Sequence, residues 1–315
     1  MSNTYDVVII GGGPSGMTAG LYACRARMKT ILVEKLLCGG QALVADTIEN
    51  YPGFPEGIKG PDLAEWMLKQ AEHFGLEVKI AEAKSIELKD TGKNAFRIHL
   101  QEGDMLEAFS LILATGAAWN QLNIPGEKEL AGRGVSYCAT CDGPLCRGKD
   151  VVVIGGGDTA LEDAIFLTKF ARKVTVIHRR DKLRATKILQ ERAFANKKIE
   201  FCLNSIAVEI KGADKVEAVA VKDVKTGQVS EISSGAAFVL VGMTPNSGIV
   251  KGIVKLDEKG HIETDDEMRT SVEGIFACGD VRRKLLRQVV TAAGDGATAA
   301  FSAGHYVEGL SSLRG

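Results

Sequence analysis

Two copies of one pattern decide the fold of this chain. Residues 7–16 read VVIIGGGPSG and residues 151–160 read VVVIGGGDTA. In both copies a short β-branched run, at 5–10 in the first and 150–154 in the second, ends in three glycines. A stretch of helical character and a second strand-like run follow each copy, at 15–27 and 30–33 in the first and at 159–170 and 173–177 in the second. Strand, glycine turn, helix and strand in this order predict a βαβ unit. Two such units predict an α/β chain with two nucleotide-binding units.

The first copy carries the residues that a dinucleotide site needs. Gly11 permits a tight turn, Gly13 lets the backbone approach a pyrophosphate, and Gly16 lets the helix pack closely on the strand. The helix N-terminus then faces the phosphates. Glu34 ends the second strand, where a carboxylate accepts hydrogen bonds from a ribose 2′-hydroxyl. The alternative, a glycine-rich turn that binds nothing, is disfavoured because strand, helix and acid stand in register.

The second copy, Gly155-x-Gly157-x-x-Ala160, differs at the position that selects the nucleotide. His178 stands where the first copy has Glu34, and it opens a basic cluster. The other members of this cluster are Arg179, Arg180 and Arg184. Guanidinium groups pair with a 2′-phosphate through charge-assisted hydrogen bonds, whereas a carboxylate repels it. We therefore expect a ligand with a free 2′-hydroxyl in the first unit and NADPH in the second; the alternative is a solvated basic helix start.

The composition narrows the classes of function. At roughly 100–200 residues per domain, 315 residues suggest two domains, and a net charge of −1 leaves no positive surplus for nucleic acid. The longest apolar stretch, 236–241, is far shorter than the ~20 residues of a membrane span, and the polar N-terminus leads directly into a strand. Neither a membrane span nor a signal peptide is expected. Seven cysteines are too few for a disulfide scaffold, which favours a reducing cytoplasm.

The only CxxC motif is Cys138-Ala139-Thr140-Cys141. A zinc site needs two more ligands, and the nearest candidates, Cys146 and His178, do not form an evident set of four, so no metal is expected. A redox pair fits better, and Asp142 directly after it is a candidate proton donor or acceptor for thiolate chemistry. Two buried cysteines close by chance are the alternative.

The remaining cysteines are interpreted mostly as apolar fillers. Cys24, Cys202 and Cys278 lie in or beside helix- and strand-like patterns. Cys38, before two glycines, and Cys146, shortly after the CxxC, leave two interpretations open, packing or proximity to the redox centre, and packing is favoured.

Further elements complete the organisation predicted from the sequence. A Pro/Gly-rich stretch and an amphipathic helix follow the first unit, then alternating strands, two buried strands and a long final helix. Their expected ranges are 51–61, 63–74, 85–113, 238–241, 274–277 and 287–308.

Taken together, the motifs resemble those of the low-molecular-weight, bacterial-type thioredoxin reductases, flavoprotein disulfide reductases with two dinucleotide-binding domains. The resemblance covers nearly the whole chain, and CATCDG together with HRRxxxR is its most specific part. The matching segments are GGGPSG at 11–16, GGQ at 39–41, IENYPGF at 48–54, ATG at 114–116, CATCDG at 138–143, GGGDTA at 155–160, HRR at 178–180, GD at 279–280 and RQV at 287–289.

This resemblance implies two Rossmann-like domains, with an NADPH domain inserted in a discontinuous FAD domain. The FAD domain is expected at 1–117 and 247–315, and the NADPH domain, which carries the CxxC, at 118–246. FAD contacts are implied for Gly11, Gly13, Ser15, Gly16, Glu34, Gly40, Gln41, Asn50, Thr115, Gly116, Gly279, Asp280, Arg287, Gln288 and Val289. NADPH contacts are implied for Gly155, Gly157, Asp158, Thr159, His178, Arg179, Arg180 and Arg184. A homodimer is implied by the resemblance alone.

The implied reaction passes electrons from NADPH through FAD to a Cys138–Cys141 disulfide and then to oxidised thioredoxin or a thioredoxin-like protein. Cys141 is implied to face the flavin, Cys138 to attack the partner disulfide, and Asp142 to act as the acid–base group. The pair cannot face the flavin and a protein at once, so the NADPH domain is implied to rotate about linkers near Ala117 and residues 244–247.

Several alternatives remain at this stage. The same chemistry could serve a glutaredoxin-like or peroxiredoxin-linked partner. A ferredoxin–NADP reductase would lack the CxxC, a dithiol oxidase would lack the arginine cluster, and a flavin-binding sensor would show no turnover. The chain departs from the family pattern at Asn120, at the apolar stretch 42–45, at Cys146 and at the basic stretch 282–284, which is expected to contact a partner.

Overall fold

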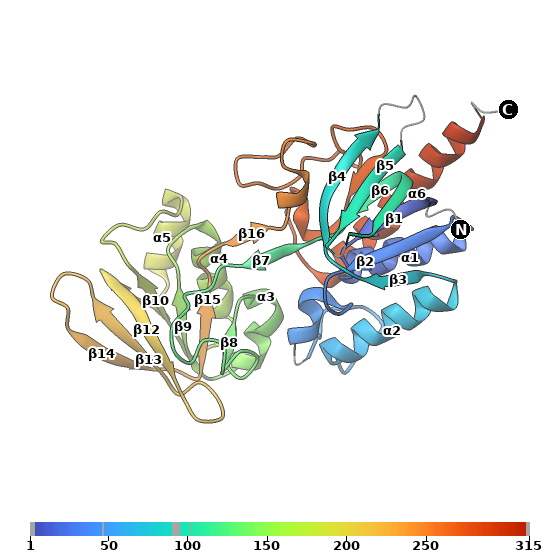
Figure 1. Ribbon diagram of the computed structural model, residues 1–315. Helices are drawn as coiled ribbons and strands as arrows, with labels where there is room; N and C mark the ends of the chain where they lie inside the picture. The colour runs from blue at the N-terminus through green and yellow to red at the C-terminus, as the bar shows by residue number, and fades with distance from the viewer. Residues whose placement is uncertain (1–3, 46, 90–94, 102, 313–315) are drawn as a thin grey trace. The chain divides into compact units, whose positions relative to one another are not determined.

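The computed structural model describes residues 4–45, 47–89, 95–101 and 103–312. The chain divides into two compact units (Figure 1). Unit 1 consists of Met1–Ala118 and Thr244–Gly315, and unit 2 consists of Trp119–Met243. Each unit contains one of the two glycine motifs within a βαβ arrangement. The mixed α/β fold predicted from those motifs is therefore confirmed.

Unit 1 is built on a seven-stranded sheet in the order β3-β2-β1-β6-β5-β4, and β17 also pairs with β6. The strands are β1 (Thr4–Ile10), β2 (Thr30–Glu34), β3 (Glu77–Ile80), β4 (Ala83–Lys89), β5 (Ala95–Leu100), β6 (Met105–Leu113) and β17 (Ile275–Ala277). β4 and β5 pair antiparallel, whereas β1, β2, β3, β6 and β17 run parallel. Parallel strands bring their carboxyl ends to one edge, so the segments that follow β1, β2 and β17 meet there.

Helices pack on the β1 face that Val7 and Ile9 line. They are α1 (Pro14–Arg25), α2 (Gly60–His73) and α6 (Val289–Ser312). Val7 and Ile9 share a buried cluster with residues of all three helices, and the alternate residues Val8 and Ile10 line the opposite core. α6 approaches α1 so closely that a Cβ on Gly296 would lie 2.2 Å from the Ser15 carbonyl oxygen.

Unit 2 contains a five-stranded parallel sheet in the order β11-β10-β9-β15-β8 and a separate antiparallel sheet of β12, β13 and β14. The strands of the parallel sheet are β8 (Val135–Ser136), β9 (Asp150–Ile154), β10 (Lys173–His178), β11 (Ile199–Leu203) and β15 (Ala236–Val239). The antiparallel strands are β12 (Ser205–Lys211), β13 (Ala218–Asp223) and β14 (Val229–Ser233). The antiparallel sheet shares a buried cluster with one face of the parallel sheet.

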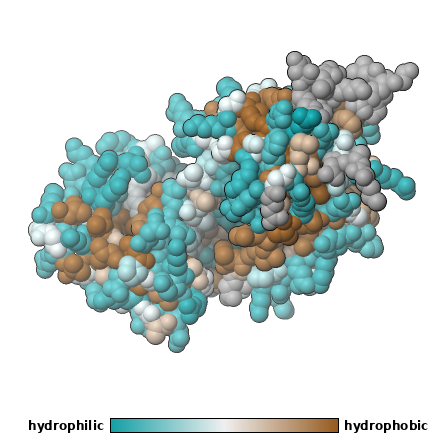
Figure 2. Space-filling view, viewed as in Figure 1, coloured by the Kyte–Doolittle hydropathy of each residue, from teal (hydrophilic) through white to brown (hydrophobic). Residues whose placement is uncertain are grey.

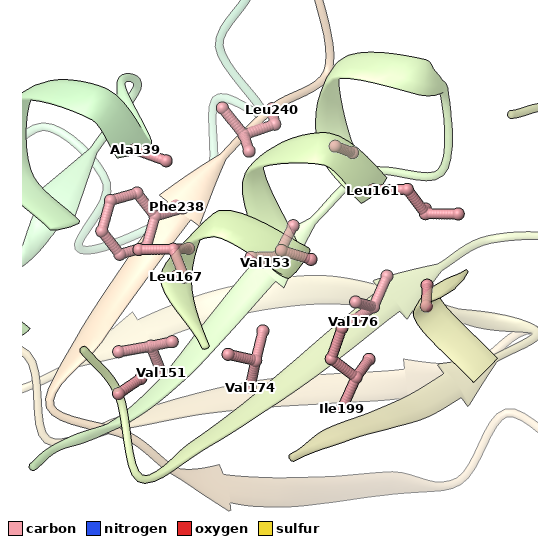
Figure 3. Close-up of a cluster of buried hydrophobic side chains, with 14 of the residues drawn as sticks. Ala139, Val151, Val153, Leu161, Leu167, Val174, Val176, Ile199, Phe238 and Leu240 are labelled. Atoms are coloured by element: carbon pink, nitrogen blue, oxygen red, sulfur yellow. The ribbon is translucent and has the colours of Figure 1, made fainter. Parts of the chain in front are cut away.

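The other face of the parallel sheet is covered by helices. They are α3 (Ala139–Asp142), α4 (Asp158–Leu167) and α5 (Lys187–Ala195). Figure 3 shows valines of β9 and β10 and Phe238 of β15 clustered with Leu161 and Leu167 of α4. Ala139, at the start of α3, belongs to the same cluster and is fully buried. The core of unit 2 therefore extends directly under the CxxC segment.

Two short strands carry the chain between the units. β7 (Ala117–Trp119) and β16 (Met243–Pro245) pair with each other as a two-stranded sheet. Single turns of 3-10 helix lie at η1 (Gly40–Val44), η2 (Gly143–Cys146), η3 (Gly248–Val250) and η4 (Gly279–Val281).

Most element ends differ from expectation by a few residues. α1 stops at Arg25, before the expected end at residue 27, because Arg27 adopts a positive φ of 60° that no helix tolerates. α4 ends at Leu167, before the expected end at residue 170.

The surface is mixed in character. Figure 2 shows hydrophilic side chains over much of the visible face, interrupted by hydrophobic patches. Among the described residues, no helix is long and apolar enough to span a bilayer.

Candidate functional site

The glycine turn after β1 forms an open cradle at the start of α1. Gly11 has φ +109°, and a Cβ there would lie 2.4 Å from the Ala114 carbonyl oxygen. A Cβ on Gly16 would lie 1.9 Å from the Gly11 oxygen, so both positions require glycine. In contrast, apart from Gly13 and its two chain neighbours, no described residue has an atom within 4 Å of a Cβ built on Gly13. The backbone at the α1 N-terminus is therefore accessible to an anion.

Glu34 lies beside this turn, as the sequence predicts. One carboxylate oxygen accepts a hydrogen bond from the Gly12 amide at 2.7 Å, and the other accepts one from the Leu36 amide at 3.1 Å. A carboxylate offers about four lone-pair sites, so these two bonds fix its orientation and leave capacity for ribose hydroxyls.

Several expected cofactor residues from distant parts of the sequence meet in unit 1. The Asn50 amide donates to the Gln288 side-chain oxygen at 2.8 Å. Gln41 donates to the Ala117 carbonyl oxygen, and a Cβ on Gly40 would lie 3.1 Å from the Gly13 Cα. Three further expected residues lie on their own segments: Thr115 and Gly116 directly after β6, where both bond Asn246, and Val289 at the first position of α6.

Asp280 presents an unsatisfied polar atom at the edge where β1, β2 and β17 end. Gly279 before it has φ +74°, and a Cβ there would lie 2.5 Å from the Ser15 hydroxyl. Among the described residues, neither Oδ1 of Asp280 nor Nε of Arg287 has a hydrogen-bond partner, although both atoms are buried. Burial raises the pKa of Asp280, and the charges of Lys284 and Arg287 oppose that rise. Such groups normally have partners, so this edge suits a polar ligand.

The second glycine turn is packed differently. A Cβ on Gly155 would lie 2.5 Å from the Leu240 carbonyl oxygen, and one on Gly156 would lie 2.2 Å from Nδ1 of His178. His178 is buried under the turn, and its Nε2 lies 3.2 Å from the Lys182 carbonyl oxygen. Burial lowers the pKa of His178, the hydrogen bond with the Lys182 carbonyl opposes this effect, and the neighbouring arginines lower the pKa further. This histidine therefore supports the turn as a neutral ring and is not an exposed cation.

The arginines of the cluster, in contrast, are exposed. Arg179 and Arg180 follow the carboxyl end of β10 directly. Apart from Gly157 and its two chain neighbours, the only described atom within 4 Å of a Cβ built on Gly157 is Nη2 of Arg184, at 4.0 Å. Asp158 and Thr159 open α4, and the Asp158 carboxylate accepts a hydrogen bond from the Thr186 amide at 2.7 Å. Positive charge therefore gathers at the α4 N-terminus.

The two cysteines of the CxxC form a disulfide at the start of α3, with their Cα atoms 5.4 Å apart. Cys138 caps α3, and its sulfur accepts a hydrogen bond from the Cys141 amide at 3.2 Å. Both cysteines are partly exposed. Within the described ranges, no group of three or more His, Cys, Asp or Glu side chains is arranged to hold a metal ion.

Ser136 connects this disulfide to Asp142, a role that the sequence analysis missed. Its hydroxyl donates to the Asp142 carboxylate at 2.5 Å and accepts from the Cys138 amide at 3.1 Å. A serine two residues before the CxxC is the sequence feature from which this role could have been predicted. The carboxyl next to the disulfide is thereby held in one orientation.

Two acidic side chains, one fully buried and one half-buried, also hold the segment around the disulfide. Glu127 is fully buried and accepts hydrogen bonds from two backbone amides and from the Tyr137 hydroxyl, which lies 3.0 Å away. Tyr137 immediately precedes Cys138 and stacks on Trp119 of β7. On the opposite side, Asp163 of α4 accepts a hydrogen bond from the Ala139 amide, and burial raises its pKa to about 6.

Known proteins resemble this chain over nearly its full length. A family model described as pyridine nucleotide-disulphide oxidoreductase matches residues 5–296. The thioredoxin reductase of Treponema pallidum is 48% identical over 98% of this chain and 99% of its own length. That of Bacillus subtilis is 48% identical over 97% of this chain and 96% of its own length. The crystal structure of thioredoxin reductase from Streptococcus pyogenes matches with a TM-score of 0.93 and 48% identity, covering 98% of this chain and all of that one.

The chain belongs to the low-molecular-weight thioredoxin reductase family. The resemblance found in the motifs is confirmed, and the protein is an oxidoreductase. Membership in the thioredoxin reductase family implies a flavin and a pyridine nucleotide, and these relatives give no support to the glutaredoxin-like or peroxiredoxin-linked alternative.

Two departures from the thioredoxin reductase pattern now have structural explanations. Within the basic stretch, Arg282 and Lys284 are largely buried and contact Asp295 at 3.3 and 2.8 Å, so only Arg283 is exposed to a partner. Asp295 also accepts a hydrogen bond from the Gly279 amide at 3.1 Å, a contact that the sequence did not predict. Cys146 is buried in the core of unit 2, and burial raises its pKa to about 11, which favours packing.

Cys38 also belongs to a hydrophobic core. Its sulfur would lie 2.7 Å from a Cβ built on Gly12, and burial raises its pKa to about 11. A thiol with such a pKa is protonated at neutral pH and does not act as a nucleophile.

Proposed function

We propose that this protein uses NADPH, through FAD, to reduce the disulfide of oxidised thioredoxin. The observation that carries the proposal is the Cys138–Cys141 disulfide at the start of α3, with the Asp142 carboxyl fixed beside it by Ser136. Family membership supports the same activity, because the relatives are named thioredoxin reductases.

The cradle of unit 1 fits FAD. The open turn at Gly13 would bind the pyrophosphate, and Glu34 would bind the ribose hydroxyls. The unsatisfied atoms of Asp280 and Arg287 would bind other polar groups of the cofactor. The remaining expected contacts would complete the FAD site: Gly11, Ser15, Gly16, Gly40, Gln41, Asn50, Thr115, Gly116, Gly279, Gln288 and Val289. When bound, the flavin supplies the chemistry that joins two-electron transfer from a nicotinamide to disulfide reduction.

The exposed arginines of unit 2 fit NADPH. Arg179, Arg180 and Arg184 would bind the 2′-phosphate, while the α4 N-terminus beyond Gly157 would face the pyrophosphate. His178 would act through the turn that it supports, because its ring is buried.

The cysteines would have distinct roles in transfer to the partner. The Cys138 thiolate attacks a sulfur of the partner disulfide and forms a mixed disulfide, releasing one partner thiolate. Cys141 then attacks Cys138, which re-forms the Cys138–Cys141 bond and releases the second partner thiolate. Asp142, held by Ser136, would supply and accept the protons.

The structure also bears on the other expectations. The paired strands β7 and β16 are the segments about which unit 2 would rotate. Both units contain cysteines outside any disulfide, which suits a reducing cytoplasm. A homodimer is proposed from the family, and exposed apolar side chains on unit 1 are compatible with an interface: Leu36, Leu37, Val44, Trp66 and Leu285.

The test compares protein acceptors. Purified, FAD-loaded protein is mixed with NADPH and either oxidised thioredoxin or oxidised glutaredoxin from the same organism, and NADPH oxidation is followed. We expect the rate with thioredoxin to exceed that with glutaredoxin by at least about tenfold, because a specific surface must dock to align the sulfurs. A faster rate with glutaredoxin would refute thioredoxin as the electron acceptor. An unbleached flavin under NADPH would refute the donor.

A further inference from the structure

In unit 1 three side chains contact one another in series, and the first of them is Arg287, whose buried Nε has no hydrogen-bond partner among the described residues. Nη2 of Arg287 lies 3.1 Å from Nε2 of His261, and Nδ1 of His261 lies 3.3 Å from the Asp257 carboxylate. The other Asp257 oxygen accepts from the His261 amide at 2.8 Å. His261 is only 6% exposed, so these contacts are shielded from solvent. Neither His261 nor Asp257 figured in the sequence analysis.

The chemistry of these partners fixes the protonation of the ring. Arginine can only donate, so Nε2 of His261 must be the acceptor and the proton must lie on Nδ1, facing Asp257. Burial, followed by the charge of Arg287, lowers the pKa of His261, whereas Asp257 raises it and Lys259 lowers it. The neutral ring therefore prevails at neutral pH. The neutral ring accepts a hydrogen bond from Arg287 at Nε2 and donates one to Asp257 from Nδ1.

The segment that carries His261 lies next to the Asp280 segment. Ile262 donates its amide to the Val281 carbonyl oxygen at 3.0 Å and accepts from the Arg283 amide at 2.9 Å. His261 thus binds Nη2 of Arg287, while Nε of Arg287 remains without a partner among the described residues. A guanidinium fixed in this way presents its remaining donors in one direction.

We propose that His261 is a positioning residue for the flavin, which holds Arg287 in the orientation that binds FAD only while its ring is neutral. This inference rests on the proposed assignment of FAD to unit 1. A proton on Nε2 would replace the acceptor with a donor and place a second cation against Arg287. FAD affinity should therefore be constant at neutral and alkaline pH and fall only in acid, below the usual range of histidine, because burial lowers the pKa of His261.

The experiment measures FAD affinity from the fluorescence of released FAD between about pH 4.5 and 8, a window that extends about two units below the usual pKa of histidine. H261F removes the acceptor and should weaken binding about tenfold at neutral pH. H261Q can accept from Arg287 and donate to Asp257 without titrating, so it should keep the wild-type affinity at neutral pH and lose the acid-induced weakening. The matched control is H99Q, because the His99 side chain belongs to the same unit, is about half-exposed and lies 3.4 Å from a carboxylate oxygen of Glu87.

The outcomes separate this inference from the cofactor assignment. An H261Q protein that still weakens on acidification as the wild type does would overturn the role of His261, and so would an H261F protein of unchanged affinity. Thermal unfolding of the apoproteins shows whether H261F is folded, and H261Q carries the test if it is not. Wild-type protein that binds no FAD at any pH would overturn the proposed cofactor and this inference with it.

Discussion

Cys138→Ser is expected to lower NADPH-dependent thioredoxin reduction by roughly a thousandfold or more, as when a catalytic nucleophile is removed. A serine hydroxyl cannot form a disulfide, so the electron pair has no route to the partner. Reduction of the flavin by NADPH should persist, because the side chains proposed to bind either cofactor remain. Stopped-flow bleaching of the flavin and steady-state turnover, measured on one preparation, separate the two steps.

The companion variant Cys141→Ser tests which cysteine attacks the partner. It should lose turnover equally, but its remaining Cys138 thiolate should form a mixed disulfide with thioredoxin that persists on a non-reducing gel. Cys146→Ser is the matched control, because this buried thiol lies close in sequence and should be dispensable. A covalent complex formed by the Cys138→Ser protein, and absent with Cys141→Ser, would reverse the proposed roles.

The second large effect concerns the nucleotide. Exchanging Arg179, Arg180 and Arg184 for glutamine should raise KM for NADPH by about 100-fold, with kcat and KM for NADH little changed. Each charge-assisted hydrogen bond contributes about 1.5–3 kcal/mol. Because these side chains are exposed, we use the lower end of this range for each bond. The loss of two such bonds then weakens NADPH binding by roughly 3 kcal/mol. NADH lacks the 2′-phosphate and should not be affected.

Arg172→Gln provides the control for that triple variant. Arg172 precedes β10, whereas Arg179 follows it, and it forms an exposed ion pair with Asp150 at 2.7 Å. Its loss should leave both KM values within about twofold. An equal rise of KM for NADH and NADPH in the triple variant would show that the arginines bind a feature common to both nucleotides.

The sequence predicts the fold well where periodicity and glycine chemistry agree. β9 begins and ends at the expected residues 150 and 154, and β1 and β2 lie within one residue of expectation. The antiparallel sheet β12–β14 was not predicted, because β14 is largely exposed and shows no clear alternation of apolar residues. Edge strands of this kind are specified by their neighbours more than by their own pattern.

The candidate site divides in the same way. Gly11, Gly16 and Glu34 are recognisable because backbone geometry demands those residue types at fixed spacing. His261 and Asp295 could not be recognised in this way because their contacts form only on folding: Arg287 lies 26 residues from His261, and Gly279 lies 16 residues from Asp295. His178 illustrates the limit of register arguments. It occupies the expected position but lies buried beneath Gly156.

The central claim is that electrons from NADPH leave through one pair of cysteines. The most direct measurement treats the FAD-loaded protein anaerobically with excess NADPH, alkylates it in denaturant and maps the labelled cysteines by mass spectrometry. Cys138 and Cys141 should be labelled only after NADPH. The five unpaired cysteines should be labelled with or without it, which gives an internal control. Consumption of NADPH without new label on Cys138 and Cys141 would contradict the account.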